Sequence, residues 1–152
     1  MNRLMNQLLP LLLMPAAFAV IGFTLGRLIR GCRPKCDARY PRLVMSSIYL
    51  RDAHNSALSQ HTRMWCAFES IYFCCLEVVV ARGLDVTELG HPAAGVMHAG
   101  LTSMAASPDE IATAQLLAEW VHETNPRLPG VTVGEACKVA KSVDRKTTRL
   151  LS

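Results

Sequence analysis

The middle of the chain contains an almost unbroken apolar run. Across residues 64–81 only Glu69, Ser70 and Glu77 interrupt it. At about 100° per residue, these three polar side chains fall on one narrow stripe of an α-helix, and apolar side chains cover the rest of its circumference. The pattern therefore predicts a central helix over residues 62–83 that other helices cover on most sides.

Helical patterns also occur on both sides of this run. Apolar residues recur at helical spacing across residues 44–57, and the polar residues that follow favour a break before the central helix. Ser107 to Glu110 form a capping box with proline at the first helical position, and Thr132 with Glu135 repeats the capping-box spacing. A helix after Pro92 carries small residues that would allow close approach to the central helix, namely Gly95, Ala99 and Gly100. No strand alternation appears, so we expect an all-α domain, a four- to five-helix bundle around the buried central helix.

The N-terminal segment has a different pattern. No ionisable side chain lies between Arg3 and Arg27, and residues 8–25 are almost wholly apolar. That length just spans a bilayer core, which takes about 20 helical residues. A basic cluster follows and should stay on the cytoplasmic side. The expected organisation is a single-pass transmembrane anchor over residues 1–30, a basic linker over residues 31–42 and a cytoplasmic helical domain over residues 43–152, at the inner or plasma membrane.

Two alternatives to the anchor remain open. Ala17-Phe18-Ala19 has the small-x-small form of a signal-peptidase site, although the apolar run continues past it and a basic cluster follows. Alternatively, translation starts at Met45, and the product is a cytoplasmic domain without the preceding extension.

Charge is distributed unevenly between the two parts. Residues 1–44 hold seven basic residues against one acidic residue, and residues 45–152 hold nine against eleven, which together give the net charge of +4. A general electrostatic attraction to nucleic acid is therefore not indicated for the helical domain. Candidate contacts with anionic lipid or nucleic acid are Arg27, Arg30, Arg33, Lys35, Lys138, Lys141, Arg145 and Arg149. Cations near a helix C-terminus also stabilise the helix unaided, and of the two ligands the basic N-terminal cluster favours lipid.

No spacing of reactive side chains indicates a catalytic centre, a metal site or a cofactor. Glu69 and Glu77 are eight residues apart, about 12 Å along a helix, so they form a polar stripe that is solvated, ion-paired or partner-facing. Histidines pair at a spacing of seven residues, about 10.5 Å, which is too far for one metal ion. The cysteines of the central helix are expected to act as small hydrophobic residues, and Trp65, Tyr72 and Trp120 as core residues.

The order of features resembles the HEPN family of helical bundles. The segments that carry this resemblance are YLRDAH, MWCAFESIYFCCLEVVVARGLDV and ELGHP, within residues 43–125. The resemblance implies an up-and-down bundle that often dimerises and, in active members, cleaves RNA. Those members carry an arginine followed after roughly four to six residues by a histidine, whereas eight residues separate Arg82 from His91 here. The ribonuclease activity is therefore not carried over.

Together these patterns predict a small, non-catalytic, membrane-anchored protein whose helical domain binds a protein partner or a second copy of itself as a homodimer. The alternative is a soluble HEPN-like nucleic-acid-binding or RNA-processing domain of a defence or toxin–antitoxin type system. The slightly acidic helical domain disfavours nucleic acid as the partner.

Overall fold

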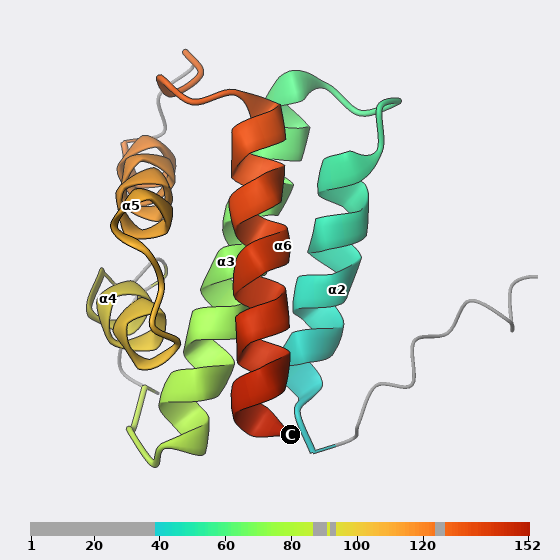
Figure 1. The fold of residues 1–152 in the computed structure, drawn as a ribbon. Helices are drawn as coiled ribbons and strands as arrows, with labels where there is room; N and C mark the ends of the chain where they lie inside the picture. Colours follow the sequence, from blue (N-terminus) through green and yellow to red (C-terminus); the bar gives the residue numbers. More distant parts are fainter. Residues whose placement is uncertain (1–38, 87–90, 92–93, 124–126) are drawn as a thin grey trace, which may run out of the picture. The chain divides into compact units, whose positions relative to one another are not determined.

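The computed structural model describes residues 39–86, 91, 94–123 and 127–152 (Figure 1). In these ranges the chain forms five α-helices and no strand, which confirms the all-α class. The helices are α2 (Pro41–His54), α3 (Gln60–Ala81), α4 (Ala94–Ser103), α5 (Pro108–His122) and α6 (Val133–Leu151). They belong to one compact unit that starts at Asp37. The expected transmembrane anchor lies outside the described residues.

Helix α3 is the centre of the fold. It contacts every other described helix, and Figure 1 shows α2, α3 and α6 side by side, with α4 and α5 packed beyond α3. From Cys66 to Val79 every side chain except Phe73 and Leu76 is buried, as expected for a central helix. Among the described helices, α3 alone is long and apolar enough to cross a membrane, and its burial in the domain accounts for that composition.

The start of α2 is held by a side chain from α3. Tyr40, at the N-cap, makes no side-chain cap. Instead, the backbone N–H of Arg42 donates to Oε2 of Glu77 over 2.8 Å, and the Arg42 guanidinium lies 3.6 Å from Oε1 of the same carboxylate. Glu77 therefore satisfies a free N–H at this helix end and receives a counter-charge from the same residue.

Local sequence signals account for the other helix boundaries. Both predicted capping boxes are present, at Ser107 with Glu110 and at Thr132 with Glu135. Gly83 ends α3 with φ of 81°. The equivalent position after α4 is Ala105, with φ of 50°, although glycine is the usual residue in this left-handed conformation.

Close contact between α4 and α3 depends on one of the predicted small residues. A Cβ atom at Gly100 would lie 2.5 Å from Cβ and 2.6 Å from Cα of Cys75. Gly95, in contrast, has no neighbouring atom within 4 Å of such a position. Gly100 is thus the residue that sets the approach of the two helices.

One of the expected core aromatic residues is not in the core. Tyr72 and Trp120 are buried, but Trp65 is 37% exposed. It lies at the N-terminal end of α3, where its ring contacts Trp120 edge to face at a centroid distance of 6.4 Å. Its neighbours Met64 and Cys66 are buried, so Trp65 lies on the exposed side of the first turns of α3, which the apolar run did not reveal.

Candidate functional site

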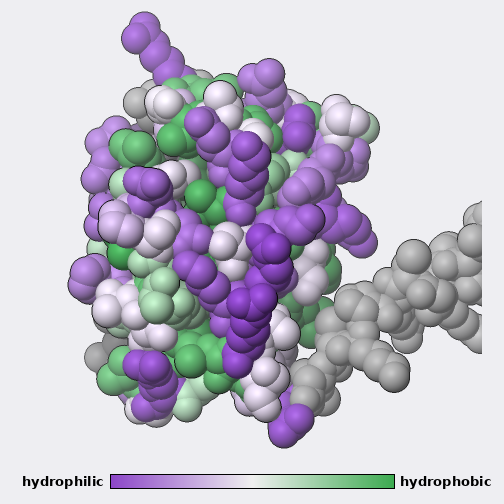
Figure 2. All heavy atoms as spheres, viewed as in Figure 1, coloured by the Kyte–Doolittle hydropathy of each residue, from purple (hydrophilic) through white to green (hydrophobic). Residues whose placement is uncertain are grey.

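Four exposed cations form a line along α6. Lys138, Lys141, Arg145 and Arg149 follow one another at intervals of three, four and four residues. At 100° per residue they fall within about 80° of the helix circumference, and they extend over about 16 Å. We call these four residues the basic face. In Figure 2 a band of hydrophilic side chains runs down the middle of the view, where Figure 1 places α6.

The opposite side of α6 fixes the direction of the basic face. Ala136, Ala140, Val143 and Thr147 are buried against the core. The Thr147 hydroxyl donates to the carbonyl of Val143 over 2.9 Å and contacts the sulfur of Met104 at 2.8 Å. Because this side is packed, the side chains of the basic face must point to solvent.

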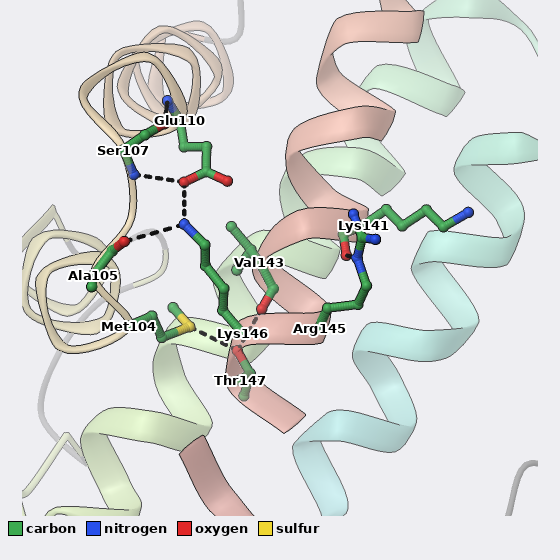
Figure 3. Close-up of polar contacts among 9 residues, drawn as sticks. All are labelled: Met104, Ala105, Ser107, Glu110, Lys141, Val143, Arg145, Lys146 and Thr147. Atoms are coloured by element: carbon green, nitrogen blue, oxygen red, sulfur yellow. Dashed lines mark hydrogen bonds and ion pairs between the residues drawn. The ribbon is translucent and has the colours of Figure 1, made fainter. Parts of the chain in front are cut away.

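Lys146 does not belong to the basic face, although it contributes to the basic composition of the helix. Its Nζ donates to Oε2 of Glu110 over 2.6 Å and to the carbonyl of Ala105 over 3.2 Å (Figure 3). In the same view Lys141 and Arg145 lie on the α2 side of α6, away from Lys146. Lys146 therefore joins α6 to the first turn of α5 and to the loop that precedes it.

Glu110 is held in its ionised form by this arrangement. Burial opposes ionisation, but hydrogen bonds from Lys146, Ser142 and the backbone N–H of Ser107 prevail and lower the pKa of Glu110 from 4.5 to about 2. The Ser107 N–H lies 2.6 Å from Oε2 of Glu110, so one carboxylate completes the capping box and also pairs with Lys146.

The basic face forms no close ion pair in the part of the chain that the structure describes, although the charges of Arg145 and Lys138 favour the ionised forms of the nearby Asp144 and Glu135. None of its four residues forms an ion pair there, and the Arg145 guanidinium donates only to the backbone carbonyl of Lys141, over 3.3 Å. Exposed cations at helical spacing repel one another unless an anion lies between them. The face therefore presents an excess of positive charge to solvent.

A pocket of about 340 Å³ lies beside the basic face, between α2 and α6. Arg51 and His54 line it from α2, and Lys141 and Asp144 line it from α6. Arg51 is paired with its neighbour Asp52 at 3.1 Å. Burial raises the pKa of Asp144 above its usual value, and Arg145 offsets part of that rise. This pocket was not predicted, because no sequence signal shows that α2 and α6 lie side by side.

The two glutamates of the predicted polar stripe are buried, with exposed fractions of 4% for Glu69 and 3% for Glu77. Glu69 accepts a hydrogen bond from Nε2 of His91 over 2.9 Å, and Glu77 pairs with Arg42. Of the sequence alternatives, the structure therefore shows paired and not solvated carboxylates. The remaining candidate cations, Arg27, Arg30, Arg33 and Lys35, lie outside the described residues.

The cysteines of the described residues are buried free thiols. Burial raises the pKa of Cys74 to about 12, although a hydrogen bond with Ser46 lowers it in part. Within the described ranges, no three His, Cys, Asp or Glu side chains are placed to hold a metal ion. These thiols therefore act as packing groups in the core.

Comparison of the chain with protein-family models, with curated proteins and with solved structures found no match. The HEPN resemblance stays a prediction. The fold, the basic face and the pocket beside it are thus the observations from which a function can be argued.

Proposed function

We propose that this chain is a membrane-anchored, non-catalytic interaction protein whose helical domain binds an acidic segment of a partner protein. The observation that carries the proposal is the basic face: four exposed cations that extend over about 16 Å and form no ion pair among the described residues. A partner that supplies carboxylates at matching spacing would neutralise this charge and bind with electrostatic complementarity.

The pocket beside the basic face supports a protein partner. Arg51, His54 and Lys141 line a concavity together with one carboxylate, Asp144, and a protruding aspartate or glutamate side chain could enter it on the side of the cations. A flat lipid surface would contact the exposed ends of the basic side chains but leave this concavity empty. A protein partner therefore uses more of the surface than a bilayer would.

The proposed anchor is a single transmembrane helix within residues 1–30, with the helical domain on the cytoplasmic side. Its support is the uncharged apolar stretch over residues 8–25 and the basic cluster that follows. The contact of Arg42 with Glu77 also argues against a start at Met45, since that start would remove the counter-charge of a buried carboxylate.

Membrane fractionation with an alkaline wash tests the anchor. The full-length protein should stay in the membrane pellet, whereas a peripheral or soluble protein is released. A product that appears wholly in the soluble fraction would refute the anchored form of the proposal.

Zero-length carbodiimide coupling tests the acidic partner. The reagent joins a lysine amine to a carboxylate in contact with it, so Lys138 and Lys141 should form isopeptide bonds with carboxylates of another protein or of a second copy. Lys146 is the internal control, because its Nζ lies 2.6 Å from Glu110 and should couple within the chain. If Lys146 couples and Lys138 and Lys141 form no intermolecular bond, the proposal is wrong.

Nucleic acid is the second candidate, because phosphates could bind the same basic face. Neutralising several phosphates would make binding fall steeply with salt concentration, and the complex would be lost on nuclease treatment. A complex that survives nuclease but dissociates when the basic face is reversed in charge favours the acidic protein.

A further inference from the structure

A second pocket, of about 620 Å³, lies beside α3 and shares no lining residue with the pocket at the basic face. Its volume is within the range of small-molecule sites, which is about 300–1,000 Å³. Side chains of α2 and α3 line it, together with Val86 and His91, which follow α3. Aromatic rings and one buried carboxylate dominate its chemistry.

The aromatic rings of this pocket include two steeply inclined pairs and one stacked pair. The Tyr72 ring is inclined at 79° to Phe73 and at 71° to His91, with centroid distances of 6.4 and 4.4 Å. Tyr49 stacks on Phe73 at 5.7 Å, and Trp65 adds a half-exposed ring to the lining. The face of an aromatic ring carries negative partial charge and attracts a cation within about 6 Å of its centroid.

Glu69 supplies a full negative charge to the same pocket. It is 4% exposed, and its contact with the His91 imidazole, at 2.9 Å, supplies positive charge only when that imidazole is protonated. The other charged residue in the lining, Arg42, is already paired with Glu77. The lining therefore contains a carboxylate in a desolvated position that neither an arginine nor a lysine of the pocket pairs with, and a bound cation would supply its counter-charge.

We propose that this pocket binds a small organic cation with a methylated ammonium group. The methyl groups of such an ion contact ring faces while its charge is balanced by a carboxylate, which are the two features that the pocket combines. Divalent metal ions fit less well, because they require several oxygen ligands. The inference is independent of the basic face and of its partner.

Choline chloride is the probe. The control is 3,3-dimethyl-1-butanol, the neutral compound in which a carbon atom replaces the nitrogen of choline. The full-length protein is titrated with each compound in a maltoside detergent by calorimetry, with the NMR signal of the Trp65 indole as a local reporter. We expect choline to bind at least about tenfold more tightly than the isostere, since the shapes match and only the charge differs.

Two substitutions locate the site. Glu69→Gln should reduce choline affinity by about tenfold and leave the isostere unaffected. Tyr49→Leu should weaken choline binding, whereas the matched Tyr49→Phe, which keeps the ring, should not. Phosphatidylcholine vesicles carry the same headgroup, and a response that depends on Glu69 there would identify lipid as the source of the ion. Equal affinities for choline and the isostere, or no saturable choline binding by the folded wild-type protein, would overturn the inference.

Discussion

At the residue scale, the buried and half-buried carboxylates of this domain differ in what stabilises them. Glu77 caps the start of α2, Glu69 faces His91, and Glu110 joins a helix cap to Lys146. Asp144 has burial without an equivalent set of donors, so its pKa is raised where that of Glu110 is lowered. These contrasts give stability predictions with opposite signs.

Glu110→Gln should destabilise the domain by about 1–2 kcal/mol at neutral pH, because it removes a charge-assisted hydrogen bond and weakens a cap. The pKa of Glu110 is lowered on folding, so its contribution is present above about pH 4.5 and lost as the pH falls toward about 2. Denaturant unfolding of both proteins should show a deficit that closes over this range. Glu135→Gln, at the exposed capping box of α6, is the matched control and should lose less; an equal, pH-independent loss in both variants would contradict the role of Lys146.

Asp144→Asn should stabilise the domain at neutral pH by a few tenths to about 1 kcal/mol, the range for a partly exposed side chain. Since folding raises the pKa of Asp144, its ionised form is disfavoured in the folded state. The contribution of the neutral Asp144 carboxyl to wild-type stability is fully present below about pH 3.8. It is lost as the pH rises through the raised pKa of Asp144 in the folded state. The gain in the variant should therefore disappear at low pH, and a gain of the same size at every pH would show that desolvation of the charge is not its cause.

At the element scale, two contacts determine how helices meet on α3. Gly100 lets α4 approach Cys75, and Glu77 holds the first turn of α2. Each contact joins another helix to the central helix. Its loss should therefore lower the stability of the whole domain and not only of a single helical turn.

Gly100→Ala should lower the free energy of unfolding by about 2–3 kcal/mol, because the new methyl group would overlap backbone and side-chain atoms of Cys75. Gly95→Ala on the same helix meets open space and should be neutral or slightly stabilising. Thermal unfolding by circular dichroism compares the two. Similar unfolding temperatures for both variants would mean that α4 and α3 are not as close as described.

Glu77→Ala should cost about 3 kcal/mol, since it leaves the N–H and guanidinium of Arg42 without their partner. In a chain that starts at Met45 the same substitution should cost much less, because Arg42 is already missing. Urea unfolding of four proteins forms a double-mutant cycle: the full-length chain and the chain that starts at Met45, each with and without Glu77→Ala. Additive losses in that cycle would show that Arg42 and Glu77 do not stabilise each other.

At the scale of the whole molecule, sequence patterns predicted where helices occur better than which side chains are buried and which helices are neighbours. The apolar run identified α3, and both capping boxes identified helix starts, because these signals are local. Burial of Glu69 and Glu77 could not be predicted, since their partners, His91 and Arg42, come from distant parts of the chain. The basic face followed from spacing along one helix, but the pocket beside it required the pairing of α2 with α6.

The proposed function rests on the charge of the basic face, so reversing that charge is its most direct test. The comparison is between the full-length protein, a Lys138→Glu, Lys141→Glu, Arg145→Glu, Arg149→Glu variant and a Lys138→Arg, Lys141→Arg variant that keeps the charge. The measurement is co-purification of partner proteins from nuclease-treated, detergent-solubilised membranes over a series of salt concentrations. We predict that the partner is retained by the wild-type and arginine variants, is released by rising salt and is absent from the folded charge-reversed variant. An unchanged set of partners on the charge-reversed protein would contradict the account.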